Sequence, residues 1–171
     1  MSSFLALLPE GSALDALRHH PRAEFEGVRW EPERRWHITL RYTPHSDERT
    51  LALLGEVADE VAESVCPAAI SLGPVTERLG RDGTLVVPGA GAEHLALGIE
   101  EALGGVLGEA EHPFYGHLTL ARLRGKAPVP AELCGVGLEA VFEASEIVLI
   151  ESNPGPQGSL YTVHHRSALS G

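Results

Sequence analysis

The sequence has little of several features that mark specialised classes of protein. Its 171 residues include two cysteines, Cys66 and Cys134, and no Cys-x-x-Cys motif. Two isolated cysteines disfavour both a disulfide framework and a cysteine zinc site. No apolar run approaches the roughly 20 residues of a membrane-spanning helix. Residues 1–12 lack the basic start of a signal peptide. We therefore expect a cytoplasmic protein without a membrane segment.

Positive charge is also scarce. Lysine and arginine together number 13 against 24 acidic residues, which gives a net charge of −11. This balance disfavours a broad basic surface for long nucleic acid, but a local basic pocket for a nucleotide or a short nucleic-acid end is compatible with it. All but one of the basic residues are arginines, whose planar forks suit phosphate oxygens. Genome composition would explain the same bias. The arginines of the first third are Arg18, Arg22, Arg29, Arg34, Arg35, Arg41 and Arg49.

The rest of the composition is that of an ordinary globular protein. Hydrophobic residues make up 43% of the chain, which is enough for a core and argues against disorder. Hydrophobic periodicity predicts strands and helices in both halves. The expected strands cover 3–9, 25–30, 36–43, 68–79, 84–89, 116–124, 144–152 and 158–169, and the expected helices cover 9–20, 46–65 and 92–107. This order predicts an α+β fold of two lobes, and a single domain over residues 1–171.

One short motif occurs twice. The chain reads His-Ile-Thr-Leu at 37–40 and His-Leu-Thr-Leu at 117–120, each inside an apolar segment typical of a strand. Successive side chains of a strand point to opposite faces. His37 and Thr39 therefore share one face, and His117 and Thr119 do the same in the second copy. The aliphatic residues between them suit a core on the other face.

Two histidines across a cleft can perform acid–base chemistry on a phosphodiester. An unperturbed histidine titrates near pH ~6.5, so both its protonation states are accessible at neutral pH. Threonine hydroxyls can donate to the non-bridging phosphate oxygens. This scheme requires no metal and no cofactor. Two simpler readings remain open, since a histidine in a strand is often structural, and nine histidines could include a zinc site. No His-Glu-x-x-His spacing is present to favour zinc.

With their flanks, the two motifs resemble the two-histidine phosphoesterase superfamily, and within it the RNA 2′,3′-cyclic phosphodiesterases, also called 2′-5′ RNA ligases. The similarity runs nearly end to end. It is carried by FLALLPE, VRWEPERRWHITLRYTP, HPFYGHLTLARLR and EIVLIESNPGPQGSLYTVHHRSAL. The resemblance implies a bilobed α+β fold. In that fold two antiparallel sheets face a central cleft, helices lie outside, and a pseudo-two-fold axis relates the motifs.

The resemblance also implies roles for single residues. His37 would be the general acid that protonates the departing ribose 3′ oxygen, and His117 the general base that activates water. The residues alone leave open which histidine is acid and which is base. Thr39 and Thr119 would bind the phosphate.

Four further residues are candidates for substrate binding. Arg122 fits the family's His-x-Thr-x-x-Arg pattern, although alternation turns it away from His117 unless the strand bulges. Tyr161 and Phe4 would line the nucleoside side of the cleft, or serve as core aromatics. Arg41 lies on the His37 face by alternation and is a secondary phosphate candidate.

These observations predict a metal-independent enzyme that opens a terminal 2′,3′-cyclic phosphate to a 2′-phosphomonoester. Its partner would be an RNA 3′ end or a nucleotide, and we expect a monomer. The alternatives are a 2′-5′ RNA ligase, an enzyme for another cyclic phosphate such as ADP-ribose 1″,2″-cyclic phosphate, an RNA-end-binding module without turnover, and a metal-dependent hydrolase.

Overall fold

Two central strands, β3 (Ile38–Thr43) and β7 (His117–Leu123), carry the two motifs. The computed structural model describes residues 1–81, 83–125, 128–156 and 158–171. Its ten-stranded sheet has the order β10-β9-β1-β3-β7-β6-β4-β8, with β2 beside β7 and β5 beside β6. The other strands are β1 (Ser2–Leu7), β2 (Val28–Trp30), β4 (Ala68–Leu72), β5 (Glu77–Leu79), β6 (Thr84–Ala90), β8 (Ala140–Ala144), β9 (Glu146–Asn153) and β10 (Leu160–Ala168).

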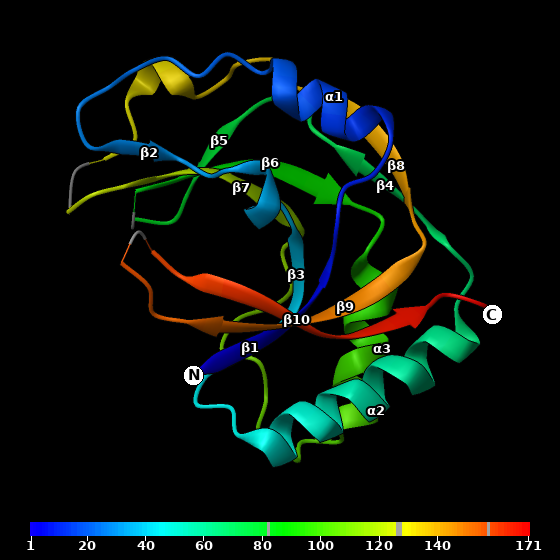
Figure 1. The fold of residues 1–171 in the computed structure, drawn as a ribbon. Coiled ribbons are helices and arrows are strands. Elements are labelled where there is room, and N and C mark those ends of the chain that lie inside the picture. The colour runs from blue at the N-terminus through cyan, green and yellow to red at the C-terminus, as the bar shows by residue number, and fades with distance from the viewer. Residues whose placement is uncertain (82, 126–127, 157) are drawn as a thin grey trace.

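The sheet consists of two halves that meet where β3 contacts β7: β10, β9, β1 and β3 form one, and β7, β6, β4 and β8 with β2 and β5 form the other. The strand pairs are antiparallel, and the two halves are joined through the pair Ile38–Leu118. Figure 1 shows the two lobes, with β2, β5 and β7 in one and β1, β9 and β10 in the other. The predicted α+β class is confirmed. The two predicted sheets are continuous with each other because β3 and β7 touch at their motif ends.

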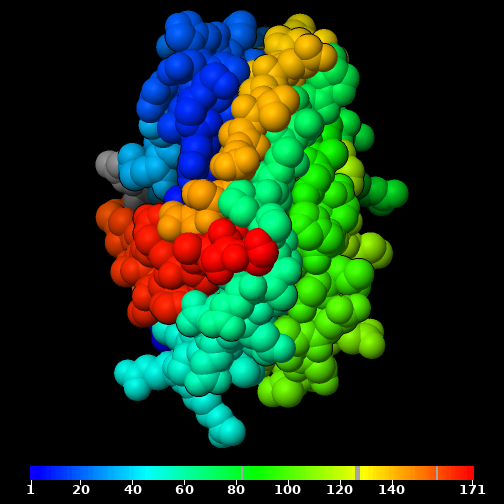
Figure 2. Space-filling model, turned by 90° about the vertical axis from the view of Figure 1, so that its right-hand side faces the viewer, coloured from blue at the N-terminus to red at the C-terminus, as the bar shows by residue number. Residues whose placement is uncertain are grey.

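Helices cover the outer side of this curled sheet. They are α1 (Ser12–His19), α2 (Glu48–Ser64) and α3 (Glu93–Leu103), with two 3₁₀ turns at Glu33–Arg35 and Ala131–Leu133. Helix α2 packs on β9, β10 and α3, and α3 packs on β3. Figure 2 shows this outer face, where α2 and the C-terminal strand lie side by side. No helix in the described part of the chain is long and apolar enough to cross a membrane.

An apolar core between sheet and helices fixes the motif strands. Ile38 and Leu118, the aliphatic residues of the two motifs, are fully buried in it together with Leu54 of α2 and Ile99 of α3. Burying a side chain of this size is worth about 1.5–3 kcal/mol. The apolar face of each motif therefore anchors its strand and leaves the polar face to the cleft.

Both motif strands contain a bulge at the same place. On β1, Leu5 pairs with Arg41 and Ala6 with Thr39, so that Leu40 is an extra residue. On β6, Leu85 pairs with Ala121 and Val86 with Thr119, which makes Leu120 the extra residue of β7. A bulge reverses the facing of every residue that follows it. This reversal decides which side chains beyond each threonine reach the cleft.

Candidate active site

The strand register brings the two motifs together. Because Ile38 pairs with Leu118 in antiparallel fashion, His37 lies opposite Thr119 and Thr39 lies opposite His117. Directly opposed side chains have Cβ atoms roughly 5 Å apart, and diagonal ones are separated by roughly 7–8 Å. The two histidines occupy a diagonal, and all four side chains are half-buried. This register places two imidazoles and two hydroxyls on one face of the two adjoining strands.

Both imidazoles are held in the same way. Nδ1 of His37 lies 2.7 Å from the carbonyl oxygen of Arg35, and Nδ1 of His117 lies 2.7 Å from that of Tyr115. A carbonyl oxygen only accepts hydrogen bonds, so Nδ1 carries a proton and donates in both rings. Each Nε2 is therefore the nitrogen that gains or loses a proton. Such an orienting bond is what general acid–base catalysis requires.

Two aromatic side chains pack against His37. Phe4 stacks on its ring with centroids 4.6 Å apart, and Tyr161 meets the ring edge-on at 5.7 Å. Phe4 and Tyr161 also touch each other, with centroids 5.2 Å apart. The structure thus brings the two predicted aromatics to the first motif. Both line the cavity beside His37, although Phe4 is itself almost fully buried.

The environment of His37 favours its neutral form. The pKa of His37 is lowered to about 4, chiefly by burial, and the nearby Arg122 and His117 act in the same direction. The carbonyl of Arg35 and the carboxylate of Glu31 act in the opposite direction. In the free protein at neutral pH, His37 is therefore uncharged. Burial likewise raises the pKa of the Tyr161 phenol, which stays protonated.

Arg122 faces the cleft because of the bulge in β7. It lines the cavity with His37 and Thr39, and its Nε donates to Oε1 of Glu31 at 3.0 Å. Alternation alone turns Arg122 away from Thr119, and the extra residue at Leu120 turns it back. The structure therefore brings Arg122 to the same cavity as His37 and Thr39.

Arg41 is placed differently from the prediction. Alternation puts it on the face of His37, but the bulge at Leu40 turns it into the core, where its side chain is 4% exposed. Both oxygens of Glu100 lie 2.6 Å from its Nη1, and the carbonyl of Gly108 accepts from Nη2 at 2.9 Å. The expectation that Arg41 shares the face of His37 is wrong: its guanidinium lies in the wall of a separate hollow beside His117 and ties β3 to α3 through Glu100. In its place Tyr42 lines the cavity.

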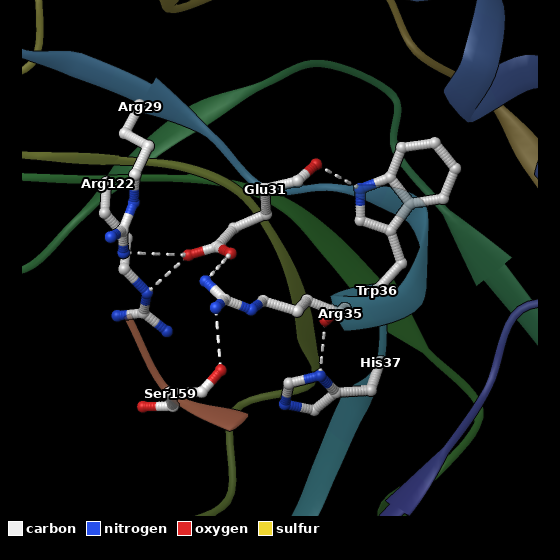
Figure 3. A network of polar contacts seen from close by, with 7 residues as sticks. All are labelled: Arg29, Glu31, Arg35, Trp36, His37, Arg122 and Ser159. Carbon is white, nitrogen blue, oxygen red and sulfur yellow. Dashed lines mark hydrogen bonds and ion pairs between the residues drawn. The ribbon is translucent and has the colours of Figure 1, made fainter. Parts of the chain in front are cut away.

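A buried carboxylate that the sequence reading missed organises the arginines beside His37. Glu31 is 4% exposed, and its backbone N–H donates to Leu120. Its Oε2 accepts from Arg35 at 3.3 Å, and its Oε1 lies near Arg122 and Arg29 (Figure 3). A buried carboxylate needs such partners to offset the loss of hydration. The sequence signal was an acidic residue among arginines in WEPERRW, which alone predicts only a solvated turn.

Two cavities meet at Thr39. One has a volume of about 400 Å³ and contains His37, Arg122 and Tyr161 in its wall. The other has a volume of about 880 Å³, and His117 lies in its wall. Thr39 lines both cavities. Among the described residues, no group of three or more histidine, cysteine, aspartate or glutamate side chains is placed to hold a metal ion.

Solved structures share this fold over the whole chain. TT0787 of Thermus thermophilus has a TM-score of 0.84 and 24% identity, with coverage of 100% of this chain and 99% of the other. Apo E. coli LigT has a TM-score of 0.72 and 18% identity, with coverage of 99% and 98%. The MHV ns2 PDE domain has a TM-score of 0.59 and 12% identity, with coverage of 96% and 100%. No family model matches the chain. No curated protein matches it either. The bilobed fold expected from the motifs is therefore confirmed.

Proposed function

We propose that the protein is a two-histidine phosphodiesterase that opens a terminal 2′,3′-cyclic phosphate of RNA, or of a nucleotide, to a 2′-phosphomonoester. The observation that carries this proposal is the pair of identically held imidazoles on adjacent strands. Each donates from Nδ1 to the carbonyl two residues before it and keeps Nε2 for proton transfer. A purely structural role for either histidine would not require this repeated arrangement.

In the proposed reaction, the base histidine takes a proton from water at Nε2, and the oxygen of that water attacks phosphorus. The bond from phosphorus to the ribose 3′ oxygen breaks, and the acid histidine gives its Nε2 proton to that oxygen. Thr39 and Thr119 donate to the non-bridging oxygens, and Arg122 offsets their negative charge. Following the family resemblance, we assign His37 as the acid and His117 as the base. Each proton transfer contributes roughly 10²–10⁴-fold in rate.

The acid role of His37 depends on the bound substrate. The low pKa of His37 in the free protein leaves it neutral. An anionic phosphate placed against the ring favours the charged form and raises the pKa. The catalytic proton of His37 would then be acquired as the substrate binds. The nucleoside of that substrate would lie against Phe4 and Tyr161, which already pack on the ring.

The solved complexes of the structural neighbour support a nucleotide substrate. E. coli LigT has been crystallised with 3′-AMP, with ATP, with NADP⁺ and with phosphate. The fold that the two proteins share thus binds nucleotides in that relative. We extend nucleotide binding to this chain because its own cleft holds a half-buried imidazole pair and an arginine.

Product analysis in EDTA tests the proposal. Purified protein is incubated with an oligonucleotide that ends in a 2′,3′-cyclic phosphate, and the products are separated by chromatography. We expect a 2′-phosphomonoester at a rate that chelation does not change. A 2′-5′ linked product would identify a ligase, and loss of turnover in EDTA would identify a metal-dependent hydrolase. Binding without any product would identify an RNA-end-binding module.

A further inference from the structure

Arginines continue along one edge of the cleft beyond His37. The cavity at His37 adjoins a second hollow of about 530 Å³, and the two share Arg29 and Arg35 in their walls. The second hollow adds Arg34, Arg124 and Trp30. We call Arg29, Arg34, Arg35 and Arg124 the arginine edge. They come from the segment around β2, from the 3₁₀ turn and from the end of β7, so the fold gathers them from distant parts of the sequence.

Glu31 holds the inner part of this edge in place. Its single carboxylate lies between three guanidinium groups, those of Arg29, Arg35 and Arg122 (Figure 3). Arg35 is fixed further by the carbonyl of Ser159, which accepts from Nη2 at 2.7 Å. Three positive charges against one negative charge leave this group with a charge of +2. A local positive field is thus built into a protein whose net charge is −11.

The opposite end of the cleft has the reverse polarity. The cavity at His117 is lined by Glu93, Glu100, Glu109 and Glu111. Its wall also includes Arg41, whose guanidinium is bound to Glu100. A phosphate chain is repelled from this acidic wall and attracted to the arginine edge. The field therefore sets the direction in which a polyanionic substrate lies across the two histidines.

An aromatic side chain accompanies the arginines. Trp30 lines the second hollow, and its indole Nε1 donates to the carbonyl of Ala23 at 3.1 Å, which fixes the ring. The side chain remains partly exposed. Aromatic rings beside basic side chains are the combination on which single-stranded nucleic acids bind, with bases stacked and phosphates neutralised.

We propose that the arginine edge is a second anion-binding subsite, which takes the phosphate on the 5′ side of the terminal nucleotide. The inference rests on the proposed function and narrows its substrate class. The protein would select RNA 3′ ends, or nucleotides that carry a 5′-phosphate, over nucleosides whose only phosphate is the cyclic one. Trp30 would stack the base that precedes the terminal nucleotide.

Isothermal titration calorimetry tests the subsite without any turnover. The ligands are adenosine 3′-phosphate, adenosine 3′,5′-bisphosphate, and an ApA dinucleotide with a 3′-terminal phosphate. The test variant is the double substitution Arg34→Ala/Arg124→Ala. It removes two exposed members of the arginine edge, and neither belongs to the described ion pairs of Glu31. The matched control is Arg49→Ala/Arg78→Ala, which removes the same charge from exposed positions outside both hollows.

We expect wild-type protein to bind the bisphosphate about tenfold more tightly than the monophosphate, the size of one charge-assisted contact. This advantage should fall to about twofold or less in the test variant, persist in the control, and shrink as salt rises. Wild-type protein should also bind the dinucleotide more tightly than the monophosphate, by about the same factor as it binds the bisphosphate. Equal wild-type affinities for the monophosphate and bisphosphate, or an undiminished advantage in the test variant, would overturn the subsite. Because these measurements need no hydrolysis, they are independent of whether the cyclic phosphodiesterase assay succeeds.

Discussion

The environment of His37 predicts how the activity of the protein depends on pH. Catalysis by two histidines requires that one carries a proton and the other does not. When both are protonated the pair has no base, and activity is lost whichever histidine plays that role. The pKa of His37 is about 4, so the doubly protonated pair forms only near that pH. We therefore expect the acid limb of kcat/KM to have its midpoint near pH 4.

The size of the effect follows from the titration. At pH 5 a histidine with an ordinary pKa of about 6.5 is neutral in about 3% of molecules, whereas one with a pKa of about 4 is neutral in about 90%. A site with ordinary histidines would thus lose roughly 30-fold in kcat/KM at pH 5 relative to its acid-side plateau. The kcat/KM of this protein should remain close to its acid-side plateau at pH 5.

The assay measures initial rates on a 2′,3′-cyclic nucleotide from pH 3.5 to 8 at constant ionic strength, with circular dichroism to verify folding at each pH. The substitution Arg122→Ala provides a directional check. Arg122 lowers the pKa of His37 by its positive charge, so its removal should move the acid midpoint to higher pH. Arg49→Ala, at an exposed position on α2, serves as the control and should not move it. A wild-type midpoint near pH 6.5 would show that the buried site does not keep His37 neutral.

Three further predictions concern charge in and around the cleft. As the pH falls from 6.5 to about 4, the unfolded chain protonates His37 while the folded protein does not. The unfolding free energy should therefore decrease by up to roughly 3 kcal/mol as the pH is lowered over this range. Denaturation series at several pH values should show this decrease for wild type in excess of that for His37→Gln. Glu31→Gln removes a charge that raises the pKa of His37 and should move the acid midpoint below that of wild type, the reverse of Arg122→Ala. Arg41→Met breaks the buried pair with Glu100; it should lower unfolding free energy by roughly 2–4 kcal/mol in urea titrations.

The parts of the site that follow from local pattern were predictable. Alternation placed His37 and Thr39 on one face and Ile38 in the core, because the side chains of a strand alternate without regard to the rest of the fold. The motif residues of β7 followed the same rule. Strand β8 (Ala140–Ala144) carries the same signal, since Phe142 is buried and Val141 is 60% exposed, but it was not among the expected strands.

The parts that depend on neighbouring strands were not predictable from one sequence. The bulges at Leu40 and Leu120 arise in pairing with β1 and β6, and they exchange the expected facings of Arg41 and Arg122. The role of Glu31 becomes visible only when Arg122, from the distant strand β7, meets it beside the local Arg35. The start of α2 illustrates the same limit. Ser46 and Asp47 both have side chains that can cap a helix, but the Ser46 hydroxyl bonds to Ser3, and the carboxylate of Asp47 accepts from the backbone N–H of Thr50.

The most direct test of the proposed histidine pair measures turnover of a 2′,3′-cyclic phosphate in EDTA by wild-type protein and by His37→Ala and His117→Ala separately. We expect a 2′-phosphomonoester from the wild type, and a loss of at least about 100-fold in kcat for each variant. Thermal melts should confirm that both variants fold. Near-full activity in either well-folded variant, or an untouched substrate with the wild type, would contradict the claim that the two imidazoles act on one phosphate.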